Sequence, residues 1–164
     1  MDPLSILSIA GIAGATAKAA WDIGTKLRVF FNDIKDVDKT VNELVAEVEA
    51  LSSACEIVDQ RLHDIVRDYE AEVSRPRAGE AKLWACIEAQ VRKSQRSIAQ
   101  LEAAFLKIQR EHTNRLVQVW RQFTINIQAK DIKEARDRLR FQTMSLQTVL
   151  QALAMQVILS FQTN

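Results

Sequence analysis

The chain has 164 residues, 48% of them hydrophobic, and carries 22 Lys and Arg against 21 Asp and Glu. This balance gives no general attraction to nucleic acid or to anionic lipid, and the length suits one domain with a sizeable core. Only 4 Gly and 2 Pro leave little room for turns. The composition therefore favours long helices with few connections.

The first predicted helix starts at Asp2-Pro3, an acidic N-cap followed by proline at the first helical position. Residues 3–17 are uncharged, and a helix that is apolar on most sides lies in a core or in lipid. The 14 residues from Leu4 to Ala17 are fewer than the roughly 20 of a transmembrane helix, and Asp2 argues against a signal peptide. We expect this helix to run to about Phe31, with Gly24 as a weak point or as its end.

Small residues crowd the second half of this uncharged stretch. The rows at helical spacing are Gly11, Ala15 and Ala19; Ala10 and Gly14; and Ala13 and Ala17. Such rows let two helix backbones approach closely, especially in lipid, where packing must replace the hydrophobic effect. They also allow tight packing inside a soluble bundle, and periodicity alone favours this second interpretation.

Three later segments show the apolar period of about 3.5 residues that is typical of helices packed lengthwise. The first precedes the break at Pro76 and Gly79, and its apolar positions are Val37, Val41, Leu44, Val48, Leu51, Cys55, Val58, Leu62, Ile65 and Tyr69. The second has Trp84, Ile87, Val91, Ser94, Ile98, Leu101, Phe105 and Ile108. The last begins around Asp131 and has Ile132, Ala135, Leu139, Leu146, Val149, Leu150, Leu153 and Val157.

A short helix is predicted between the second and third of these segments, capped by Thr113 or Asn114. Its apolar positions are Leu116, Val119, Trp120, Phe123 and Ile127. No charge follows Arg140, but glutamines spread around the last helix would be costly in lipid, which favours a central bundle helix over a second membrane segment. We therefore predict an all-α bundle of four to five helices with a long apolar N-terminal helix, in one domain of residues 1–164. The predicted core seam is Val41, Leu44, Val48, Leu51, Val58, Leu62, Trp84, Ile87, Val91, Leu101, Leu146 and Leu153.

No catalytic constellation is visible, so we expect no enzyme, no metal, no cofactor and no small-molecule substrate. The histidines, His63 and His112, belong to no metal or nucleophile pattern, and the glycines form no phosphate loop. Cys55 and Cys86 lie on predicted apolar faces and are expected to be core thiols. The basic stretches have acidic neighbours, so we expect no binding to nucleic acid.

The opening "MDPLSILSIAGIAGATAKAAWDIGTKL" resembles the start of fungal HeLo-like domains, the N-terminal domains of many fungal STAND (NOD-like) receptors and of some ankyrin-repeat proteins. "FFNDIKDVDKTVNELVAEVEALSSACEIVDQRL", "LWACIEAQVRKSQRSIAQLEAAF" and "KDIKEARDRLRFQTMSLQTVLQAL" resemble later helices of that family, so the resemblance covers nearly the whole chain. Its specific part is the "MDPLS" start followed by a small-residue apolar helix. HeLo-like domains are similar to the four-helix killer domain of the mixed-lineage kinase-like pseudokinase.

The resemblance implies a latent, pore-forming effector of programmed cell death in fungal immunity and heterokaryon incompatibility, cytoplasmic at rest and at the plasma membrane once active. A fused sensor domain or a NOD-like/STAND receptor would bring copies into a homo-oligomer. The N-terminal helix (residues 1–24) would then leave the bundle and enter membrane lipid. The resemblance also implies that the chain is the N-terminal part of a longer protein. The alternative is a non-lytic oligomerisation or adaptor domain of a STAND-type receptor.

The family's glycine-rich first-helix motif carries over to Gly11, Gly14 and Gly24, while Ala15 and Ala19 stand where an ideal glycine zipper has more glycine. The positions expected to act in insertion are Leu4, Ile6, Leu7, Ile9, Gly11, Ile12, Gly14, Ala15, Lys18, Ala19, Trp21 and Gly24. In the resting state we expect the large apolar ones among them to be buried against the other helices. These are Leu4, Ile6, Leu7, Ile9 and Ile12.

Overall fold

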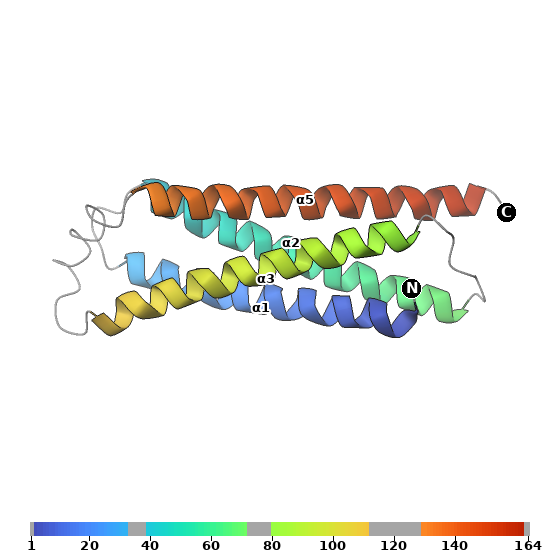
Figure 1. Cartoon of the computed structure of the whole chain (residues 1–164), viewed down its shortest axis with the longest axis horizontal. Helices are drawn as coiled ribbons and strands as arrows, with labels where there is room; N and C mark the ends of the chain where they lie inside the picture. Colours follow the sequence, from blue (N-terminus) through green and yellow to red (C-terminus); the bar gives the residue numbers. More distant parts are fainter. Residues whose placement is uncertain (1, 33–38, 72–79, 112–128, 163–164) are drawn as a thin grey trace.

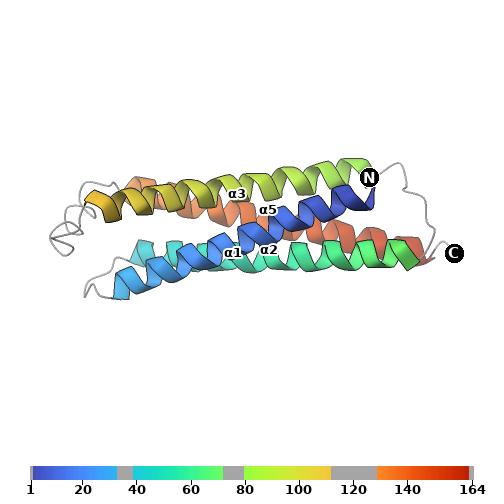
Figure 2. The same ribbon diagram turned by 90° about the horizontal axis from the view of Figure 1, so that it is seen from below.

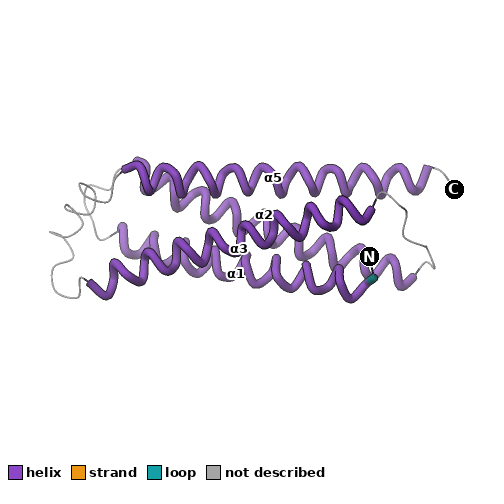
Figure 3. The backbone as a smooth tube through the Cα atoms, in the orientation of Figure 1, coloured by secondary structure: helices purple, strands orange, loops and turns teal. Residues whose placement is uncertain are grey.

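The computed structural model describes residues 2–32, 39–71, 80–111 and 129–162, and these contain four long helices (Figure 1). The helices are α1 (Pro3–Asn32), α2 (Lys39–Ala71), α3 (Glu80–Glu111) and α5 (Ala129–Gln162). The described part of the chain contains no strand, as the tube in Figure 3 also shows. The predicted all-α bundle with a long N-terminal helix is confirmed. The short helix predicted between residues 113 and 127 lies outside the described residues.

The four helices lie side by side along their length, and their directions alternate (Figures 1 and 2). α1 and α3 run in one direction, and α2 and α5 run in the other. α1 packs against α2 and α3, and α5 packs against the same two helices, so α1 and α5 occupy opposite corners of the bundle. Each helix therefore has one face toward the core and one toward solvent, which explains the period of about 3.5 residues.

The predicted apolar seams form the core. All twelve positions of the predicted core seam are buried except Leu101, which is partly buried. Along α2 the burial passes from Leu62 to Val66, and Ile65 is only partly buried. An untwisted helix turns every 3.6 residues, so an apolar face drifts around a helix that is read with a strict spacing of 3.5. The side chains of Val37, Tyr69, Ile108 and Val157 are outside the described residues.

Two polar side chains of α5 lie in the core, where apolar periodicity could not place them. Gln142 and Thr143 are buried, and the Gln142 Nε2 donates a hydrogen bond to the Ser97 Oγ of α3 at 2.7 Å. The Gln142 Oε1 has no hydrogen-bond partner. Because a buried amide without partners is costly, the bond to Ser97 fixes how α5 sits on α3.

The two thiols differ in their surroundings. Cys55 is buried in α2, and burial raises the pKa of its thiol to about 12. Cys86 of α3 is exposed, so the prediction of a core thiol is wrong there. Trp84 and Ile87 take the core positions on that turn, and Cys86 falls between them on the outer side of the helix.

Candidate functional site

The start of α1 is capped as the sequence predicts. The Asp2 carboxylate accepts a hydrogen bond from the Ser5 backbone N–H at 2.8 Å, and Pro3 is the first helical residue. This bond satisfies one of the amide groups that an α-helix leaves without a partner at its N-terminus. The same hydrogen bond lowers the pKa of Asp2 below its ordinary value of 3.8. The cap therefore fixes where the apolar helix begins.

One seam of α1 faces the bundle, and it alternates steps of four and three residues without a miss. Its members, all buried, are Ile6, Ala10, Ala13, Ala17, Ala20, Gly24, Leu27 and Phe31. The structure thus shows which of the rows of small residues identified from the sequence face the core. The row through Ala13 and Ala17 faces the core, whereas Gly11 and Ala15 face solvent. The alternating spacing already present in the sequence marks this seam.

The residues expected to act in insertion are distributed over both faces of α1. Ile6, Ile9 and Gly24 are buried, and Leu7, Ile12, Gly14 and Ala19 are partly buried. Leu4, Gly11, Ala15, Lys18 and Trp21 are exposed. The prediction that Leu4 is buried at rest is wrong: its side chain is 78% exposed, because it falls on the solvent side of the first turn. Gly24 is not the end of the helix, which continues to Asn32.

The middle of α1 lies close to α2. The Ser52 Oγ of α2 donates a buried hydrogen bond of 2.7 Å to the backbone carbonyl oxygen of Ala17. A side chain as short as serine reaches the backbone of a neighbouring helix only where small residues separate the two. A Cβ atom on Gly24 would lie 3.4 Å from the Val48 Cγ1, which is ordinary packing distance. The buried alanines of α1, here called the alanine seam (Ala10, Ala13, Ala17 and Ala20), thus allow the two helices to lie close together but bury little apolar area per residue.

The glycines of α1 are not demanded by backbone conformation in the resting bundle. No described glycine has a positive φ. A Cβ on Gly11 would meet no atom within 4 Å, and one on Gly14 would lie 2.8 Å from the Asp59 Oδ2, the far end of a side chain that can rotate. Each glycine inside a helix costs about 1 kcal/mol relative to alanine. Three of the four glycines of the chain therefore weaken this one helix, and at Gly11 and Gly24 an added Cβ would meet no clash.

The C-terminal half of α1 is held by ion pairs and an aromatic contact that the first half lacks. The Arg28 Nε donates to the Glu49 Oε1 of α2 at 3.1 Å, and the Lys26 Nζ lies 3.9 Å from the Glu102 Oε1 of α3. The Phe30 ring meets the Phe105 ring of α3 edge-on, with 5.5 Å between centroids. Exposed ion pairs contribute little individually, but they fix the position of this end of the helix.

α1 is also the helix that could enter a membrane. Among the described residues it alone combines sufficient length with sufficient apolar character to cross a bilayer, and 39% of its most apolar stretch is buried. Its exposed side chains include Leu4, Trp21 and Val29. A helix that is apolar because it lies in a core should be buried along most of its surface. Burial thus accounts for only part of the apolar character of α1.

The described residues contain no cluster of His, Cys, Asp or Glu that could hold a metal ion. His63 is exposed, and its Nδ1 lies 3.0 Å from the Asp59 Oδ1 one turn earlier on α2. His112 lies outside the described residues.

The candidate site is therefore α1 together with the α2 surface on which it packs, and the interactions there are those of helix packing. No protein-family model, curated protein or solved structure matches the chain.

Proposed function

We propose that the chain is a latent membrane-targeting effector of cell death, in which clustering releases α1 from the bundle so that it inserts into a bilayer and permeabilises it. The observation that carries this proposal is the outward face of α1. In its first half that face has Leu4, Ser8, Gly11 and Ala15, with no charge before Lys18. The exposed face of α2 instead carries charged residues such as Glu56 and Arg61.

The attachment of the first half of α1 is moderate in strength. Ile6 and Ile9 are its fully buried large side chains, and each such burial is worth about 1.5–3 kcal/mol. The alanines that follow bury less apolar area, and the glycines weaken the helix itself. A few kcal/mol is enough to keep the resting population nearly complete, yet small enough for membrane contact to reverse.

The dimensions of α1 constrain how it would enter a membrane. The uncharged residues 4–17 span about 21 Å, less than the hydrocarbon core of about 30 Å. The helix continues through Lys18 and Trp21, both exposed. Lysine can extend its charged end toward the headgroups and tryptophan favours the interface. Insertion of α1 therefore requires these two residues at one interface, or a locally thinned bilayer.

Ala15→Asp tests the proposal without disturbing the core, because Ala15 is exposed in the resting bundle. A charge in a membrane-spanning segment costs up to about 2.5–3.5 kcal/mol at the centre, and Ala15 lies about 9 Å along the helix from Trp21, inside the hydrocarbon region. Copies clustered by a C-terminal tetrameric coiled coil should release dye from liposomes. The Ala15→Asp variant should do so more than about tenfold more slowly, with an unchanged thermal midpoint.

Ala89→Asp is the matched control, since Ala89 is an exposed alanine on α3. It should leak like the wild type. A clustered wild-type chain that never releases dye would overturn the membrane proposal, and so would equal leakage by Ala15→Asp.

The second candidate function is a non-lytic oligomerisation or adaptor domain of a STAND-type receptor. The observation in its favour is an exposed, uncharged face of α5 that carries Phe141, Met144 and Met155. Exposed apolar patches of this kind are typical of protein contacts. Under this function, Met144→Asp should abolish association of the chains and Ala15→Asp should not. The membrane function predicts loss of leakage with Ala15→Asp.

A further inference from the structure

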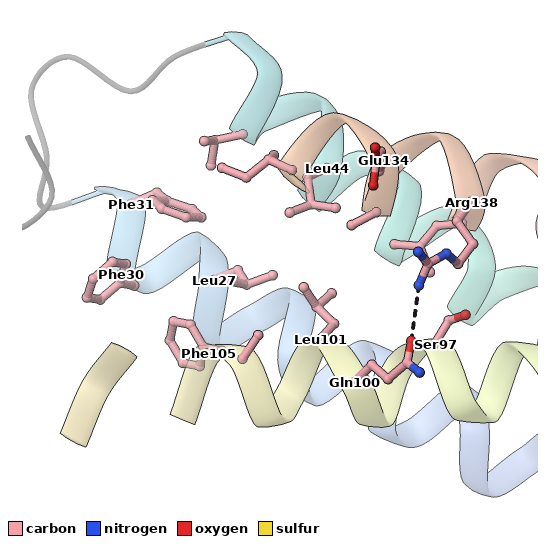
Figure 4. Close-up of a pocket in the computed structure, with 15 residues that line it drawn as sticks. Leu27, Phe30, Phe31, Leu44, Ser97, Gln100, Leu101, Phe105, Glu134 and Arg138 are labelled. Carbon is pink, nitrogen blue, oxygen red and sulfur yellow. Dashed lines mark hydrogen bonds between the residues drawn. The ribbon is translucent and has the colours of Figure 1, made fainter. Parts of the chain in front are cut away.

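A cavity of about 250 Å³ that is partly open to solvent lies at the end of the bundle where α1 finishes and α5 begins (Figure 4). All four described helices line it, and its apolar residues include Leu27, Phe31, Leu44, Leu101, Phe105 and Leu139. A dry apolar cavity of about 150 Å³ in another protein binds benzene, and sites for drug-sized molecules measure about 300–1,000 Å³. The size of this cavity therefore fits a small apolar molecule or the chain of a small amphiphile.

Polar groups of α3 and α5 line one side of the cavity. The Arg138 Nη1 donates a hydrogen bond of 3.1 Å to the Gln100 Oε1, a neutral acceptor. Figure 4 shows the Arg138 side chain reaching toward Gln100, while Glu134, one turn earlier on α5, lies away from Gln100. A ligand carboxylate in the place of the Gln100 amide would give Arg138 a charge-assisted hydrogen bond, which is about twice as strong as a neutral one.

We propose that this cavity binds a linear alkyl monocarboxylate of medium chain length. The alkyl chain lies among the leucine and phenylalanine side chains, and the carboxylate meets Arg138 at the polar side. At about 30 Å³ for each water-sized group, the cavity holds about eight such groups, which is the size of octanoate. The site requires only the closed bundle, so the proposal does not depend on the membrane function.

Binding at this site would stabilise the folded bundle, including the second half of α1. Leu27, Phe30 and Phe31 come from the last turns of α1, and the other lining residues come from α2, α3 and α5. A ligand that binds the closed bundle and not the opened chain shifts the equilibrium toward the closed form. Octanoate should therefore raise the thermal midpoint of unfolding.

Calorimetric titration of the full chain with octanoate, octan-1-ol and octylammonium tests both the cavity and its polarity. Octanoate should bind most tightly, and octan-1-ol about tenfold more weakly because it lacks the charge. Octylammonium should show no saturable binding. No saturable binding by octanoate, or equal binding by all three probes, would overturn the proposal.

Four variants separate the cavity from the charge. Ala135→Phe places a ring in the cavity and should abolish octanoate binding, with Leu101→Phe serving the same purpose should the first variant fail to fold. Arg138→Gln should weaken octanoate about tenfold and leave octan-1-ol within about twofold. Arg140→Gln changes an exposed arginine of α5 outside the cavity and should bind like the wild type. Octanoate binding that survives both cavity-filling variants would place the ligand elsewhere. Leakage does not enter these measurements, so either proposal can fail alone.

Discussion

The two halves of α1 are attached to the bundle by different kinds of contact. Residues 3–17 have no charged side chain and are held by buried isoleucines and alanines. Residues 18–32 add the ion pairs of Arg28 and Lys26 and the edge-on contact of Phe30 with Phe105. Large buried side chains, such as Leu27 and Phe31, also occur in this half. Because of these contacts, the second half of α1 can remain attached to the bundle when the first half detaches.

Because of this difference, releasing only the first half of α1 costs less free energy than releasing the whole helix. Opening the first half exposes Ile6, Ile9 and a row of alanines, whereas opening the second half also breaks contacts with both α2 and α3. Local opening follows the segments with the fewest buried apolar contacts. The hydrogen bond of Ser52 to the Ala17 carbonyl marks the boundary between the two halves.

The largest effect expected from a single substitution is loss of a buried isoleucine. Ile9→Ala and Ile23→Ala each remove a fully buried side chain and should cost about 2–5 kcal/mol of unfolding free energy. Hydrogen exchange should then differ between them. Ile9→Ala should deprotect residues 4–17 and leave residues 24–32 protected, whereas Ile23→Ala should deprotect both. Equal deprotection of both halves in Ile9→Ala would show that α1 opens as one unit.

The alanine seam gives the next largest effect. Ala13 is fully buried, so Ala13→Leu should overpack the contact with the other helices and cost about 1–3 kcal/mol. Ala15→Leu makes the same change on the exposed face and should stay within about 0.5 kcal/mol. Urea unfolding of both variants measures the difference. A neutral Ala13→Leu would mean that the close approach of α1 to the bundle is not required for stability.

The sequence predicts which residues are apolar and periodic better than it predicts which row of small residues is buried. The seams of α2 and α3 were predictable because large apolar residues recur at regular spacing. In α1, alanine and glycine occur on every side, so composition alone did not separate the buried Ala13 from the exposed Ala15, and only the alternating steps of four and three residues mark the buried row. The prediction that Leu4 is buried was wrong for a related reason. Apolar residues cover a wide arc of this helix, so the sequence does not show which side faces the core.

Ser94 was predicted as a seam position and is buried, but the sequence did not predict the buried polar side chains of α5 or the cavity. Apolar periodicity does not predict that Gln142 is buried, because it carries no information about a partner such as Ser97 on another helix. The cavity depends on the spacing of all four described helices at one end of the bundle, and the sequence does not show that spacing.

A smaller effect is expected at the boundary between the two halves. Ser52→Ala removes the buried hydrogen bond to the Ala17 carbonyl and should cost about 0.5–1.5 kcal/mol. Ser53→Ala, on the exposed side of α2, should be neutral. Calorimetric unfolding of the two variants gives the comparison. If both are neutral, then the hydrogen bond does not contribute to the attachment of α1, and only the packing of the alanine seam attaches the helix near Ala17.

The smallest effect concerns pH and the first turn. The hydrogen bond from the Ser5 N–H lowers the pKa of the Asp2 carboxyl in the folded state below 3.8. Folding therefore favours the ionised carboxylate, so the cap contributes fully above the ordinary value and the contribution is lost as the pH falls through the lowered pKa. Hydrogen exchange of residues 5–8 should accelerate relative to residues 24–32 as the pH falls from about 5 to about 2.5, after correction for intrinsic exchange rates. Asp2→Asn keeps a capping oxygen that does not titrate, so its relative exchange should be flat over the same range. An identical pH response in both chains would mean that other carboxylates cause the change. The Asp2 cap would then not contribute to the attachment of the first half of α1.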